Sequence, residues 1–160
     1  MAETIALIFL IPAAMITLIS LLVAVTYLWP QRSNQASQAL DKSPGRSFII
    51  GFVNLLFFGI LATFLLQQEE FAGLLALILI LILAGIAGLG MGGFLLLLTT
   101  RIFPQAEDLW KARLKTAVLL ILALSAPILG WFIFTPLLLI LSLGAGITAL
   151  FRRAKPQVEF

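Results

Sequence analysis

Residues 71–100 read FAGLLALILILILAGIAGLGMGGFLLLLTT and contain no charged side chain. A membrane-spanning helix needs about 20 consecutive apolar residues, and this run offers about 30. As one helix it would be roughly 45 Å long, so tilt, a kink in its glycine-rich middle or extension into the headgroups must fit it to a ~30 Å hydrocarbon core. The run predicts a transmembrane helix and makes lipid the solvent of this chain.

The composition of the whole chain agrees with that prediction. Of its 160 residues, 62% are hydrophobic and 11% are charged, whereas soluble domains contain roughly 25% charged residues. A soluble fold of this size has no means of hiding so much apolar surface, because small domains expose much of what they contain. We expect a single integral membrane domain over residues 1–160.

Two further apolar runs are long enough to cross a bilayer. Residues 4–29 form the first, and its length and acidic start distinguish it from a secretory signal. Residues 47–66 form the second, with about the 20 residues of one span. The polar segment 31–46 between them predicts a solvated, flexible loop, and residues 67–70 predict a tight polar turn.

The segment 101–115 interrupts the apolar pattern. Pro104 is able to start a helix, on which Ala106, Trp110 and Leu114 would share one face. Two alternatives stay open: a short helix lying on the membrane surface, or a loop anchored by the indole. In either case, the residues expected to contact the cytoplasmic membrane surface are Trp110, Lys111, Arg113 and Lys115.

The last apolar run, residues 116–151, is too long for one crossing, because a single helix would measure about 54 Å. Two full crossings need about 40 residues, so two would be tight. Pro127 and Pro136 interrupt the run. We predict a helical hairpin of residues 116–134 and 136–151, and length alone leaves open whether it spans twice or is re-entrant.

The distribution of charge selects an orientation. With the N-terminus outside, the cytoplasmic segments are 31–46, 101–115 and the tail from residue 152. They contain all ten basic residues, which are Arg32, Lys42, Arg46, Arg101, Lys111, Arg113, Lys115, Arg152, Arg153 and Lys155. The charged residues outside are only Glu3, Glu69 and Glu70. This is the positive-inside pattern.

The predicted fold is therefore an all-α, polytopic transmembrane helical bundle with the N-terminus outside and the C-terminus inside. It has three full spans plus a C-terminal helical hairpin, or about five membrane segments.

Small side chains recur every four residues in the third run, at Ala84, Gly88 and Gly92. This spacing lets helix backbones approach closely, which is how helices associate in lipid. Ser142 and Gly146 repeat the spacing in the last run and are the predicted partner face. Packing within one chain is the simpler interpretation, and a subunit interface or a pore-lining groove is the alternative.

The polar groups inside the predicted spans are few. Asn54 is the most informative, because an amide in lipid needs a hydrogen-bond partner, and we predict that it joins helices rather than binds a ligand. No charged residue lies inside any predicted span. Ionisable groups within the membrane mark ion paths and proton relays, so their absence argues against a coupled pump or a voltage sensor.

An intramembrane enzyme would have to work without histidine, cysteine or an acidic residue inside a predicted span. The chain has no cysteine and no histidine, which excludes disulfides, thiolate metal sites and histidine-held haem. The acid pairs Glu69/Glu70 and Glu107/Asp108 are adjacent in sequence, so their side chains point apart. We predict no enzyme, no cofactor and no metal site. Nucleic-acid binding is not expected either, because the basic residues border apolar runs instead of forming a basic face.

Two stretches carry a resemblance to a known group of proteins. Residues 43–51 read SPGRSFIIG and open a helix, while residues 126–130 (APILG) and 135–137 (TPL) make a proline-interrupted double run. Together they resemble the uncharacterised multi-helix membrane regions associated with bacterial bactofilin-like polymer-forming proteins. The similarity covers roughly residues 43–153, lacks the β-helical domain and adds an N-terminal span. It implies a membrane-anchoring or scaffold role and carries over no catalytic residue.

The sequence thus predicts a small structural or accessory membrane protein that associates through its helices, with copies of itself or with a larger complex. The alternative is a passive channel or carrier for a neutral or apolar solute, since interrupted helices often border binding sites in transporters. The expected partners are the lipid bilayer and a membrane protein or a homo-oligomer. The expected location is a multi-pass position in a bacterial inner or plasma membrane.

Overall fold

Every regular element of the described chain is a helix, which confirms the all-α class. The computed structural model describes residues 2–67 and 70–151. The elements in order are α1 (Ala2–Leu28), α2 (Pro30–Lys42), α3 (Pro44–Leu66), α4 (Glu70–Ile102), α5 (Leu109–Ser125), the π turn η1 (Gly130–Phe134) and α6 (Thr135–Phe151). Glu69 and the basic tail from residue 152, which entered the predicted charge pattern, lie outside the described residues.

Three helical segments are long and apolar enough to cross a membrane. They are Pro44–Leu66 in α3, Ala72–Ile102 in α4, and Gly130–Phe151, which joins η1 and α6. A fourth candidate is the pair Pro12–Leu28 and Pro30–Lys42, which is bent by 102° at the junction of α1 and α2. These segments make the chain a membrane protein.

The prediction of a flexible loop at residues 31–46 is wrong, because residues 30–42 form the helix α2. Ala36 and Leu40 are one helical turn apart and both are buried, so one face of α2 packs into the protein. Pro30 is in the first turn of the helix, where its missing N–H costs nothing. Most of the polar residues that indicated a loop lie on the more exposed side of this amphipathic helix, whereas Ser33 is buried with the apolar face.

The turn of the C-terminal hairpin comes earlier in the chain than predicted. α5 ends at Ser125 and the helix resumes at Gly130, so the break falls at residues 126–129 rather than at residue 135. Pro136 does not end the helix, because the residues before it form the π turn η1. A proline ring clashes with the carbonyl four residues earlier, and the wider π turn leaves room for it.

Residues 101–115 match neither alternative completely. α4 continues to Ile102, the connection to α5 is irregular, and α5 runs without a break from Leu109 to Ser125. Trp110 and the basic residues after it therefore occupy the first turns of a long helix, not a separate helix on the membrane surface.

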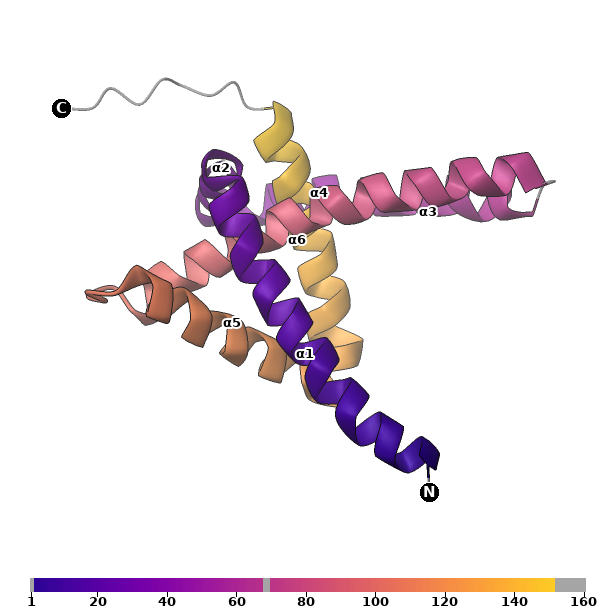
Figure 1. The fold of residues 1–160 in the computed structure, drawn as a ribbon. Coiled ribbons are helices and arrows are strands. Elements are labelled where there is room, and N and C mark those ends of the chain that lie inside the picture. The colour runs from indigo at the N-terminus through magenta and orange to yellow at the C-terminus, as the bar shows by residue number, and fades with distance from the viewer. Residues whose placement is uncertain (1, 68–69, 152–160) are drawn as a thin grey trace.

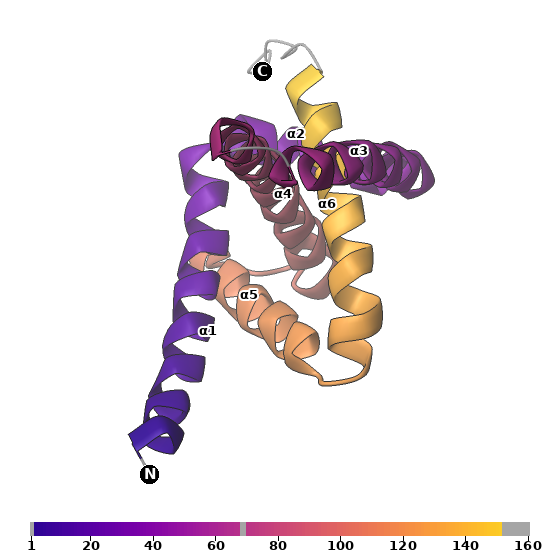
Figure 2. The same ribbon diagram turned by 90° about the vertical axis from the view of Figure 1, so that its right-hand side faces the viewer.

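The helices spread outward from the end of the molecule where α2 lies (Figures 1 and 2). α4 is the central element and contacts α1, α2, α3, α5 and α6. The α3–α4 hairpin projects to the right in Figure 1 and crosses α6 steeply rather than running beside it. Helices that cross steeply touch over a short length, so the residues at the crossing decide how closely they approach.

Two apolar clusters hold the helices together around α4. The first contains Leu22, Val23, Leu95, Ala117, Leu120 and Leu138, from α1, α4, α5 and α6. The second contains Ala36, Leu40, Ala145 and Ala149, from α2 and α6, with Phe94 and Leu97 of α4 against it. By contrast, the outer part of the α3–α4 hairpin is apolar and open: Ile60 is 69% exposed and Leu81 is 62% exposed. Lipid or another helix must cover that surface.

Candidate functional site

α6 lies directly on the backbone of α3. A Cβ added to Gly51 of α3 would overlap the carbonyl oxygen of Ile140, and one added to Gly144 of α6 would overlap the carbonyl oxygen of Ser47. Ser47 and Gly51 are one turn apart in α3, and Ile140 and Gly144 are one turn apart in α6. The two helices therefore contact each other's backbone over a single turn. Any larger residue at either glycine would push the helices apart.

α6 approaches α4 in the same way. A Cβ added to Gly90 would overlap the carbonyl oxygen of Ser142, and one added to Gly146 would overlap the carbonyl oxygen of Ile86. Ser142 and Gly146 therefore face α4, where they meet Ile86 and Gly90 rather than the predicted small-residue stripe.

α1 and α2 cover α4 one turn further along. A Cβ added to Gly93 would lie 2.5 Å from the Cβ of Ala36, which leaves no space for a side chain. One added to Gly92 would lie 2.9 Å from Val25 Cγ1 and 3.1 Å from Ser33 Oγ. Gly92, the last residue of the predicted stripe, is thus packed inside the chain.

The rest of that stripe is free. Ala84 is exposed, and no atom lies within 4 Å of a Cβ added to Gly85 or Gly88. Ala84, Gly88 and Gly92 are four residues apart and so share one face of α4. That face is covered at Gly92 and open one to two turns earlier. We call Ala84, Gly85 and Gly88 the free face of α4.

Two buried serines flank the close helix contacts. The hydroxyls of Ser33 and Ser142 are fully buried, and neither has a hydrogen-bond partner among the described residues. An unpartnered buried hydroxyl costs stability. Both serines stand where α4 comes closest, so their small size accounts for their positions.

Asn54 does not join two helices in this chain. Its side-chain nitrogen donates to the carbonyl oxygen of Ile50, one turn earlier in α3, over 2.8 Å. The amide is half-buried and, within the described residues, its hydrogen bond stays inside its own helix.

An arginine from α2 caps the end of α6. Arg32 Nη1 donates to the carbonyl oxygens of Ala149, over 2.7 Å, and Leu150, over 3.3 Å. The last carbonyls of a helix have no partners within it and carry the negative end of its dipole. Arg32 supplies both the hydrogen bonds and the positive charge that this end requires.

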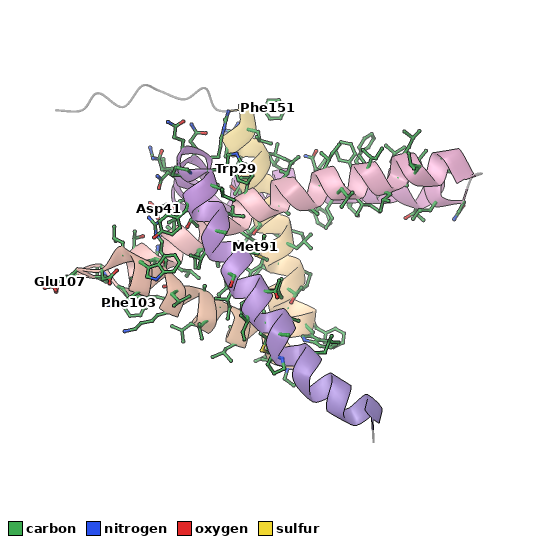
Figure 3. The ribbon with its side chains drawn as sticks, in the orientation of Figure 1. Trp29, Asp41, Met91, Phe103, Glu107 and Phe151 are labelled. Carbon is green, nitrogen blue, oxygen red and sulfur yellow. The ribbon has the colours of Figure 1, made fainter. Side chains whose placement is uncertain are left out.

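An ion pair joins the end of α4 to the end of α2, the helix that also carries Arg32. Arg101 Nη2 and Asp41 Oδ1 are 2.7 Å apart, and both side chains are more than half exposed. An exposed ion pair stabilises a fold by little, but its position is informative. Figure 3 shows Trp29 and Asp41 near α2 and Phe151 at the end of α6. The contacts of Arg32 with α6 and of Arg101 with Asp41 bring segments that are far apart in sequence together there.

α1 and α5 meet through two aromatic rings and an arginine. The rings of Tyr27 and Trp110 lie 5.5 Å apart between centroids, and the guanidinium of Arg113 lies 4.8 Å from the centroid of Tyr27. Lys111 and Lys115, which the sequence placed at the membrane surface with them, are exposed on the same end of α5. The structure thus brings Tyr27 of α1 into the predicted surface group.

Asp108 starts α5. Its Oδ1 accepts from the backbone N–H groups of Trp110, over 3.1 Å, and Lys111, over 3.3 Å. Its other oxygen lies 3.1 Å from the ammonium of Lys111. The hydrogen bonds from the side chain and the backbone of Lys111 lower the pKa of Asp108 below its ordinary value.

The start of α5 is therefore expected to weaken in acid. Because the pKa of Asp108 is lower in the folded state, the carboxylate stabilises the fold above the unfolded-state pKa, and that contribution is lost as pH falls through the folded-state pKa. Asp108→Asn keeps an N-cap oxygen and removes the charge. The melting temperature of the native chain should exceed that of Asp108→Asn at pH 7, and the difference should shrink below about pH 4. A difference that is constant over the titration would contradict this account.

The contacts described above are contacts between helices. Among the described residues, no group of three or more acidic side chains is placed to hold a metal ion. No protein-family model, curated protein or solved structure matches this chain. Its function must therefore be inferred from its own contacts.

Sequence reasoning missed several residues that make these contacts. Ser47 and Gly51 have the same small-residue spacing as the stripe of α4, so that rule was able to find them. Gly144 lies between two other small residues and carried no separate signal. The bonds of Arg32 to α6 join residues 117 and 118 positions apart, which no local pattern reveals.

Proposed function

We propose that this chain is a multi-pass protein of a bacterial inner or plasma membrane with the N-terminus outside and the C-terminus inside. Its α1, α3 and α4 would be full spans, and α5 with η1 and α6 would form the C-terminal hairpin. The meeting of basic segments supports this orientation: Arg32 contacts the end of α6, and Arg101 pairs with Asp41. α2 would then lie along the cytoplasmic surface.

Within that membrane, the chain acts as a small structural or accessory protein that associates through its helices. Its partner is another copy of the chain or a larger membrane complex. This proposal rests mainly on the free face of α4, with the exposed apolar surface around it.

The argument compares glycines on the same helix. Glycine inside a helix is less favourable than alanine by about 1 kcal/mol. Gly90 offsets that cost by letting α6 touch the backbone of α4, whereas a Cβ added to Gly85 or Gly88 meets no atom of the described chain within 4 Å. A partner helix on the free face would approach them as closely as α6 approaches Gly90.

Gly88→Leu tests the proposal, because it places a side chain on the free face at a position where a Cβ meets no atom within 4 Å. We expect the folded chain to keep its melting temperature and to lose association about tenfold, since a helix contact in lipid contributes about 1–2 kcal/mol. The measurement is mass in mild detergent together with cross-linking in native membranes, which reports both self-association and capture of a partner.

Gly59→Leu is the matched control, because Gly59 of α3 also has open space around it. Association that is equal in Gly88→Leu and the native chain would refute the proposal, as would an equal loss in Gly59→Leu. The alternative function, a passive channel or carrier, predicts something different: liposomes containing the purified chain would release a neutral solute faster than protein-free liposomes.

A further inference from the structure

Tyr27 of α1 and Trp110 and Arg113 of α5 form a cluster in which a cation is held by an aromatic ring, and helix association does not require this arrangement. Arg32 donates to carbonyl oxygens of α6, Arg101 pairs with Asp41, and Lys111 pairs with Asp108. Arg113 is different: within the described residues it has no ion-pair partner, and its guanidinium lies over the ring of Tyr27. An arginine held in this way is positioned but has its N–H groups free.

The attraction between a guanidinium and an aromatic ring acts through the ring face, so it does not use up hydrogen-bond donors. The planar fork of an arginine matches the oxygens of a phosphate, which it binds with two parallel hydrogen bonds. Arg113 is half-buried and half of the Trp110 side chain is exposed, at 52%. The cluster therefore offers an ordered phosphate-binding group at an accessible surface.

The position of the cluster indicates where the phosphate comes from. α1 ends at Leu28 and α5 begins at Leu109, so the cluster lies where two apolar helices leave the hydrocarbon core. Tyr27 and Trp110 are the amphipathic aromatic residues that favour the headgroup layer. Lys115 is two residues from Arg113 and therefore lies on another face of α5, while Glu107 lies at the outer edge of the molecule in Figure 3.

We propose that Arg113, held over the ring of Tyr27, binds the phosphate of an anionic phospholipid, which the orientation proposed above places in the cytoplasmic leaflet. The site is formed by two helices, so a lipid bound there would bridge α1 and α5. A phospholipid with a net negative charge is preferred over a zwitterionic one, because the choline of a zwitterionic lipid would bring another positive charge close to Arg113.

The test is native mass spectrometry of the full chain in mild detergent, titrated with phosphatidylglycerol or with phosphatidylcholine of the same acyl chains. Phosphatidylglycerol is expected to bind more tightly. Arg113→Gln should weaken its binding about tenfold, as expected for loss of a charge-assisted hydrogen bond. Arg113→Lys should recover only part of it, because an ammonium lacks the planar fork.

Two further comparisons separate a positioned arginine from general positive charge. Tyr27→Phe keeps the ring face and should bind like the native chain, whereas Tyr27→Leu should bind as weakly as Arg113→Gln. Arg46→Gln removes one exposed charge elsewhere and should change little. Equal binding of the two lipids, or equal losses in Arg46→Gln and Arg113→Gln, would overturn the proposal. Release of the lipid by inorganic phosphate at the same concentration would show a site for free phosphate and overturn the lipid assignment.

Discussion

Gly90→Leu is expected to abolish the folded chain. A Cβ at this position already overlaps the carbonyl oxygen of Ser142, and a leucine would force α6 away from α4. Overpacking against backbone has no flexible side chain to relieve it, so we expect a loss of at least about 3 kcal/mol in the free energy of unfolding. The measurement is the yield of monodisperse protein in mild detergent, followed by thermal unfolding of whatever fraction remains.

Gly85→Leu is the matched control, because it makes the same substitution on the same helix where a Cβ meets no atom within 4 Å. This variant should give the yield and melting temperature of the native chain. If both variants fold equally well, the close crossing of α4 and α6 does not hold the chain together. If both fail, leucine is unacceptable in this part of α4 for a reason other than that crossing.

Arg32→Met is expected to have the second-largest effect. It keeps most of the side-chain volume and removes the two hydrogen bonds to the last carbonyls of α6. Hydrogen bonds from charged groups contribute about 2 kcal/mol, and a cation at a helix C-terminus adds to this. We expect a lower melting temperature and faster hydrogen exchange in the last turn of α6.

Lys42→Met provides the comparison, since it removes a positive charge from the exposed end of the same helix. It should leave hydrogen exchange in α6 unchanged. Equal effects of the two substitutions would mean that net charge, and not the bonds of Arg32, stabilises this end of the molecule.

The sequence and the structure differ most at α2. Its residues are polar enough to be interpreted as a loop, and only Ala36, Ala39 and Leu40 are apolar among them. The buried residues Ser33, Ala36 and Leu40 are nevertheless spaced like one face of a helix, so a periodic signal was present and the polar composition obscured it. The tertiary structure decided where that face packs, because Gly92 and Gly93 leave room on α4 for Ser33 and Ala36.

The position of the turn in the C-terminal hairpin was likewise not predictable from the sequence. Pro127 and Pro136 both interrupt the run and either one is able to end a helix, so the sequence offered two breaks. The chain turns at residues 126–129 and accommodates Pro136 with the π turn η1. The choice depends on packing, because Leu138 and Ser142 must reach α4 from a helix that has already begun.

By itself, the sequence determined that the chain is an all-helical membrane protein and where its longest apolar helices run. Those features follow from hydropathy and length, which are local properties that act on each segment separately. Only the tertiary structure decided which glycines touch another backbone and which stay free, that Arg32 caps α6, and that Tyr27 joins Arg113. These contacts join segments that are distant in sequence. Gly88 and Gly90 lie in the same apolar stretch of α4, yet only Gly90 has the backbone of α6 against it.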